Sequence, residues 1–136
     1  GLALANSGLG AVHGFAAPLG GMFPAPHGAV CAALLPPVMA ANVQALRERY
    51  AESETLTRYY EVAGWLTGDD KASANAGVEW VRGLAVDLQI PRLGTYGITE
   101  ADLPGLIEQA GKASSMKANP LPLTDEELTG IIKAAL

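Results

Sequence analysis

The sequence of 136 residues contains few of the side chains from which most binding sites are built. It has one cysteine and two histidines, and 9 lysines and arginines stand against 14 aspartates and glutamates. A single cysteine excludes an internal disulfide and fits a reducing compartment, so we expect a cytoplasmic protein. The net charge of −5, together with the lack of a basic cluster, argues against nucleic acid or an anionic membrane surface as a partner.

Long uninterrupted apolar segments are also scarce. Prolines and polar residues interrupt every apolar stretch before it reaches the length of a membrane span, so we expect no membrane-spanning segment. The start of the chain lacks the basic region of a signal peptide. Gly1 is followed at once by apolar, helix-like sequence without a capping residue, and we therefore take the chain to be a fragment of a longer protein.

No segment shows the two-residue alternation of a β-strand in convincing form. Apolar side chains instead recur at helical spacing in three segments, residues 28–50, 55–66 and 72–88. Capping-box spacings predict two more helices, which begin near Thr99 and Thr124. Because this length suits one domain with its own core, we predict a single all-α, multi-helix domain over residues 1–136.

Both histidines and the cysteine fall in one stretch, residues 8–37. On one unbroken helix His13 and His27 would lie about 21 Å apart, because each residue advances the helix by about 1.5 Å. The glycines and prolines of the intervening run GGMFPAP argue against an unbroken helix. We therefore predict a helix that carries His13, a reversal over residues 22–26 and a second helix that begins near His27.

This reversal could bring the two imidazoles to one point, where neutral ring nitrogens suit Fe, Zn or Cu. A catalytic metal usually has about three protein ligands, and the chain has no third histidine. Cys31 follows His27 by four residues and so faces the same side of the second helix, which makes it a conceivable soft third ligand. The simpler alternatives are that both histidines are structural and that Cys31 packs as a small hydrophobe.

The order of residues adds a second argument. The same stretch contains GLGAVHGFAAPLGGMFPAPHGAVCAALLP, which resembles the signature of the iron-containing (group III) alcohol dehydrogenase family, approximately G-x-x-H-x-x-x-H-x-L-G-x-x-x-x-x-P-H-G-x-x-x-A-x-L-L-P. The resemblance extends to residues 2–7 before the signature and to Asn119-Pro120-Leu121 near the end. It implies the C-terminal, metal-binding half of a two-domain dehydrogenase, whose N-terminal α/β domain binds NAD or NADP and is missing from this chain.

The resemblance also implies roles for individual positions. His13 and His27 correspond to two metal-ligand histidines of the family and would hold Fe²⁺, or Zn²⁺ in its place, with an aspartate and another histidine contributed from upstream of this chain. The family's other signature histidine faces the substrate and the nicotinamide, and Ala17 stands in its place, which puts a proton relay or substrate contact in doubt. The segment before Asn119 approaches the substrate cavity in the family and indicates Ser115 as a wall residue, with a plain loop as the alternative.

The activity implied by the resemblance is metal-dependent, NAD(P)-linked interconversion of an alcohol and an aldehyde or ketone. No residue of this chain is singled out as catalytic or cofactor-binding, since no glycine-rich phosphate loop follows a strand, and we expect the isolated segment to be inactive. The implied partners are a small alcohol or aldehyde and the N-terminal nucleotide-binding domain, with a homo-oligomer left open. Two alternatives remain: a maleylacetate reductase of the same superfamily, and a non-catalytic helical binding or assembly module.

Overall fold

A computed structural model describes residues 8–136, and these residues form six α-helices joined by three short 3₁₀ helices, with no residue in a β-strand. The α-helices are α2 (Ala11–Met22), α3 (His27–Arg49), α4 (Glu54–Thr67), α5 (Ala74–Asp87), α6 (Leu103–Lys112) and α7 (Asp125–Ala135). The 3₁₀ helices are η1 (Leu93–Tyr96), η2 (Glu100–Asp102) and η3 (Ser114–Ala118). The all-α prediction is confirmed, whereas the resemblance over residues 2–7 and the helix-like start lie outside the described residues.

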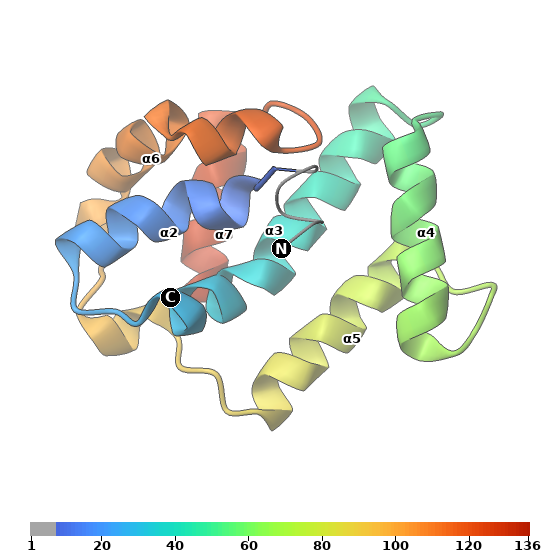
Figure 1. Cartoon of the computed structure of the whole chain (residues 1–136), viewed down its shortest axis with the longest axis horizontal. Helices are drawn as coiled ribbons and strands as arrows, with labels where there is room; N and C mark the ends of the chain where they lie inside the picture. The colour runs from blue at the N-terminus through green and yellow to red at the C-terminus, as the bar shows by residue number, and fades with distance from the viewer. Residues whose placement is uncertain (1–7) are drawn as a thin grey trace.

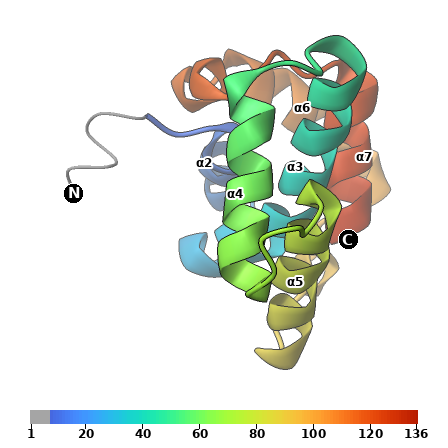
Figure 2. The same cartoon turned by 90° about the vertical axis from the view of Figure 1, so that its right-hand side faces the viewer.

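The long helix α3 runs through the middle of the molecule (Figure 1). Helices α2 and α7 pack against α3, and α6 packs against both α2 and α7. Helices α4 and α5 pack against each other on the opposite side, where both contact α3 (Figure 2). Apolar side chains accordingly form two clusters, a larger one around α2, α3, α6 and α7 and a smaller one among α3, α4 and α5.

Helix α3 continues through Pro36 and Pro37, as the apolar pattern predicted. Because the proline pair does not end the helix, α3 is long and apolar enough to cross a membrane by length and composition, and the expectation that no segment reaches this length is wrong. Several of the large apolar side chains of α3 are buried against the neighbouring helices: Val30, Leu34, Val38, Val43 and Leu46. Such burial is typical of the core helix of a globular domain.

The chain reverses between α2 and α3, as predicted from the run of glycines and prolines. Helix α2 ends at Met22, Phe23 is extended, and Pro26 occupies the N-cap position of α3, which begins at His27. Both expected capping boxes are also present, one from Thr99 with Asp102 before α6 and one from Thr124 with Glu127 at α7. The reversal determines the site, because it places the start of α3 beside the first turn of α2.

Candidate metal centre

Three potential metal ligands meet where α2 and α3 lie side by side. The sulfur of Cys31 is 3.8 Å from Nε2 of His13 and 3.5 Å from Nε2 of His27. The two imidazole rings have their centroids 5.3 Å apart with an angle of 55° between their planes. One ligand atom from each of the three side chains lies within 4.8 Å of the others, the only such group of His, Cys, Asp or Glu among residues 8–136.

The two sulfur–nitrogen distances fit ligands of a single small cation. In tetrahedral coordination by zinc, with Zn–N near 2.0–2.1 Å and Zn–S near 2.3 Å, a sulfur and a nitrogen ligand lie about 3.6 Å apart. The two sulfur–nitrogen distances fall on either side of this value. His27 is exposed while His13 and Cys31 are half-buried, so the cluster is open on one side. The donor set therefore suits a divalent ion and leaves space for further ligands.

The protonation of Cys31 depends on whether an ion is present. Burial raises the pKa of the Cys31 thiol above its ordinary value, so at neutral pH the metal-free side chain is a thiol. A thiol has one proton and can donate it to only one of the two facing ring nitrogens at a time. A bound divalent cation would favour the thiolate form of Cys31 instead, because a coordinating thiol is deprotonated outright.

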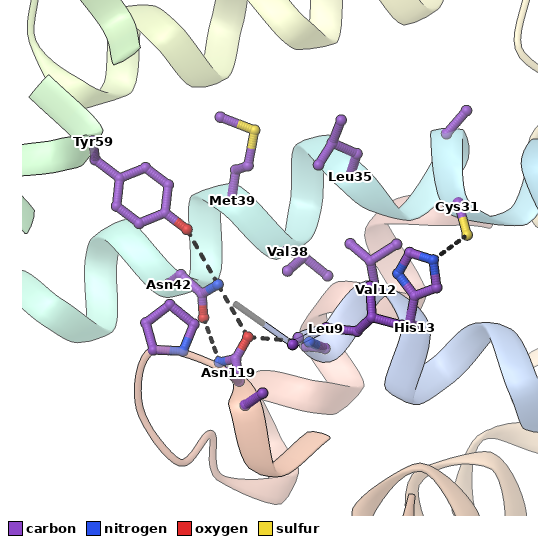
Figure 3. A pocket seen from close by; sticks show the side chains of 16 residues that line it. Leu9, Val12, His13, Cys31, Leu35, Val38, Met39, Asn42, Tyr59 and Asn119 are labelled. Carbon is purple, nitrogen blue, oxygen red and sulfur yellow. Dashed lines mark hydrogen bonds between the residues drawn. The ribbon is translucent and has the colours of Figure 1, made fainter. Parts of the chain in front are cut away.

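A cavity of about 490 Å³ opens beside His13 and Cys31 (Figure 3). Most of its wall is apolar and comes from α2, α3 and the residues just before α2, including Leu9, Val12, Leu35, Val38 and Met39. Polar side chains reach the cavity at two ends, His13 and Cys31 at one and Asn42, Tyr59 and Asn119 at the other. A mainly apolar wall with a few convergent polar groups is typical of a small-molecule site.

The polar group at the far end fixes the start of α2. Asn119 Oδ1 accepts a hydrogen bond from the backbone N–H of Ala11 at 3.1 Å, which satisfies one of the free donors of the first helical turn. The side chain of Asn42 is almost completely buried and donates to Asn119 Oδ1 and to the hydroxyl of Tyr59, both at 3.3 Å. Because His13 lies in this same first turn, the amide of Asn119 helps to position a candidate ligand.

Sequence reasoning missed the roles of Asn42 and Tyr59. Tyr59 lies in the segment 55–66, which was predicted as a helix from its apolar spacing alone. Its hydroxyl faces Asn42, and burial raises the pKa of that hydroxyl although the hydrogen bond from Asn42 lowers it in part. An asparagine within the apolar face of α3 was the available signal, because an asparagine in the interior of a helix needs a specific partner. Asn119 was noted only as part of the family resemblance.

The two other predicted site residues lie apart from this cavity. Ala17 is exposed on α2, one turn after His13, and does not line the cavity. Ser115 is half-buried in η3, which packs against α2 where Met116 meets Gly14, and it does not line the cavity either. Their contact with a substrate therefore stays a prediction.

The sequence matches, over residues 1–136, the model of the Fe-containing alcohol dehydrogenase family, C-terminal. It is 34% identical to 1,3-propanediol dehydrogenase of Klebsiella pneumoniae over 136 residues, which cover 99% of this chain and 34% of that protein. It is equally similar, at 34% over 136 residues, to lactaldehyde reductase of Escherichia coli (strain K12), with 99% of this chain and 35% of that protein covered. The chain thus spans about a third of the length of these relatives.

Solved structures share the same helical arrangement. An alcohol dehydrogenase from Oenococcus oeni superposes with a TM-score of 0.83 at 30% identity, covering 100% of this chain and 35% of that chain. A 1,3-propanediol oxidoreductase superposes with a TM-score of 0.76 at 29% identity, covering 94% of this chain and 33% of that chain. In both cases the superposed part is about a third of a longer chain, in agreement with the sequence matches.

Proposed function

We propose that the whole protein is a metal-dependent, NAD(P)-linked oxidoreductase, because this chain belongs to the Fe-containing alcohol dehydrogenase family as its C-terminal domain. It would interconvert a small alcohol with an aldehyde or ketone, the class to which the names of the propanediol and lactaldehyde relatives point. The observation that carries the proposal is the approach of His13 and His27, whose rings face the same point although the reversal separates them in sequence.

His13 and His27 would hold Fe²⁺ or Zn²⁺ through their Nε2 atoms, the atoms that face Cys31. Both are neutral nitrogen donors when deprotonated, which is the form that binds a divalent metal. The bound ion supplies Lewis-acid polarisation of the hydroxyl or carbonyl group of the substrate. The two histidines come from different helices, so their distance is held by the packing of α2 against α3.

The remaining residues of the site would bind and shield the substrate. The apolar wall from Val12, Leu35 and Met39 excludes water beside the imidazoles and can accept the hydrocarbon part of an alcohol. Ala17 offers no group that could take or give a proton. A proton leaving the substrate would therefore need a different route from the one that the family's histidine provides. The nicotinamide coenzyme would be bound mainly by the N-terminal domain.

The first experiment measures NADH and NADPH consumption by the full-length protein, loaded with Fe²⁺ without oxygen, against short aldehydes and maleylacetate. Aldehyde-dependent consumption that a chelator abolishes is expected. Consumption with maleylacetate alone would assign the protein to the reductase branch of the superfamily. No consumption by folded protein would favour a helical binding module.

A matched pair of variants tests the ligand role. His27→Ala should lower both the bound metal and the turnover, whereas Met22→Ala, an exposed change at the other end of the reversal, should alter neither. Unchanged metal content in His27→Ala would contradict the assignment. The isolated residues 1–136 should not oxidise an alcohol with added NAD, because we place the nucleotide site in another domain.

A further inference from the structure

Cys31 occupies a position that the two histidines alone do not explain. It follows His27 by one helical turn on α3, and residues four apart on a helix are neighbours on one face. The side chain of Cys31 packs against the edge of the larger apolar cluster, yet its sulfur also lies close to a ring nitrogen of each histidine. A cysteine whose only role was to fill the core would not need to meet both imidazoles.

The distances from the sulfur to both histidines are those expected between ligands of one ion. The sulfur lies 3.5 and 3.8 Å from the two Nε2 atoms, against the separation of about 3.6 Å expected between sulfur and nitrogen ligands of tetrahedral zinc. One donor atom from each of the three side chains lies within 4.8 Å of the others.

We propose that Cys31 is an additional protein ligand of the metal ion beside His13 and His27, bound as a thiolate, and that it shifts the preference of the site toward Zn²⁺ relative to Fe²⁺. This inference rests on the proposed metal site of His13 and His27. Thiolate is a soft donor that favours zinc over harder divalent ions. On binding, the sulfur–hydrogen bond is replaced by a sulfur–metal bond and the proton is released to solvent.

X-ray absorption at the zinc edge of the full-length, Zn²⁺-loaded protein tests the assignment directly. We expect one sulfur neighbour at about 2.3 Å together with nitrogen or oxygen neighbours at about 2.0–2.1 Å. Cys31→Ser and Cys31→Ala should each lose the sulfur neighbour but keep the nitrogen neighbours. Ala32→Ser is the matched control, because it places a hydroxyl on the next residue of α3 and should keep the sulfur.

Metal competition provides a second measurement. Cys31→Ser should weaken Zn²⁺ binding by more than the roughly 10–100-fold that loss of an outer-shell partner costs, and should lower the ratio of Zn²⁺ to Fe²⁺ affinity. An ion surrounded only by nitrogen and oxygen in the wild type, or a sulfur that persists in both Cys31 variants, would overturn this inference and leave the histidine site intact. Failure of the folded wild type to bind any metal would overturn both.

Discussion

The side-chain amides of Asn42 and Asn119 hydrogen-bond to each other in both directions, although the two residues are 77 positions apart. Asn119 Nδ2 donates to Asn42 Oδ1 at 2.8 Å, and Asn42 Nδ2 donates to Asn119 Oδ1 at 3.3 Å. Asn119 also accepts from the backbone of Ala11. One amide pair therefore ties α3 and the segment before α7 to the first turn of α2, where His13 lies.

Asn119→Ala should lower the free energy of unfolding by about 2–3 kcal/mol, because the buried amide of Asn42 loses its main partner and the start of α2 loses an acceptor. The metal affinity should fall as well, because His13 lies in the loosened turn. Urea denaturation and titration with Zn²⁺ measure the two effects.

Asn119→Asp separates the two contributions. Aspartate keeps an oxygen for the Ala11 N–H but cannot donate to Asn42 or to the carbonyl of Leu121. This variant should be destabilised yet retain more of the metal affinity than Asn119→Ala. Equal metal affinity in both variants would show that the amide does not position His13.

Replacing each of two glycines of α5 by alanine should change the stability of the protein in opposite directions. A Cβ added at the buried Gly77 would lie 2.9 Å from the Cβ and 3.0 Å from the Cα of Ala63, so α4 and α5 would have to move apart. We expect Gly77→Ala to destabilise the protein by about 1–3 kcal/mol. Gly83 lies on the same helix with nothing within 4 Å, and Gly83→Ala should stabilise by up to about 1 kcal/mol. Denaturant unfolding of both variants measures the difference, and effects of the same sign would contradict the observed close approach.

Much of the fold could be predicted from local sequence, because helices and their ends depend mainly on neighbouring residues. The capping spacings at Thr99 and Thr124 correctly located two helix starts. The glycines and prolines before His27 correctly located the reversal. The spacing of His27 and Cys31 also predicted that both side chains lie on the same face of α3, since four residues make about one helical turn.

The contacts that complete the site could not be predicted in this way. The pairing of Asn42 with Asn119 depends on how α3 meets the segment before α7, and no local pattern encodes that approach. The apolar length of α3 was also misjudged: prolines and polar residues were expected to interrupt every apolar stretch, yet the helix runs through Pro36 and Pro37 and is apolar enough to have the length of a membrane span. The positions of Ala17 and Ser115 relative to the cavity likewise follow from packing.

Metal removal should lower the melting temperature of the full-length protein. A ligand that binds only the folded state stabilises it by about 2.7 kcal/mol at 100 times its dissociation constant. Adding Zn²⁺ after chelation should restore the melting temperature, and His27→Ala should abolish the recovery. A differential scanning fluorimetry series against Zn²⁺ concentration measures the effect, and an equal recovery in His27→Ala would place the stabilising ion elsewhere.

Ala17→His restores the side chain that the family signature carries at this position. Because Ala17 is exposed, the substitution should cost only the weaker helix propensity of histidine, about 0.5–0.7 kcal/mol, and leave the fold intact. Bound metal should stay unchanged, since the corresponding histidine of the family is not a ligand. The new imidazole, with an ordinary pKa of about 6.5, accepts a proton only when neutral. Alcohol oxidation by the variant should therefore rise with pH through this range more steeply than in the wild type.

The matched control is Ala17→Gln, which adds a polar side chain of similar size that does not titrate in this range. Profiles of kcat/KM against pH for the wild type and both variants decide the question. A new pH dependence in Ala17→His alone would show that this face of α2 meets the substrate and that Ala17 removes a proton relay. Identical profiles in the two variants, with full metal content, would mean that Ala17 lies too far from the reacting atoms to matter.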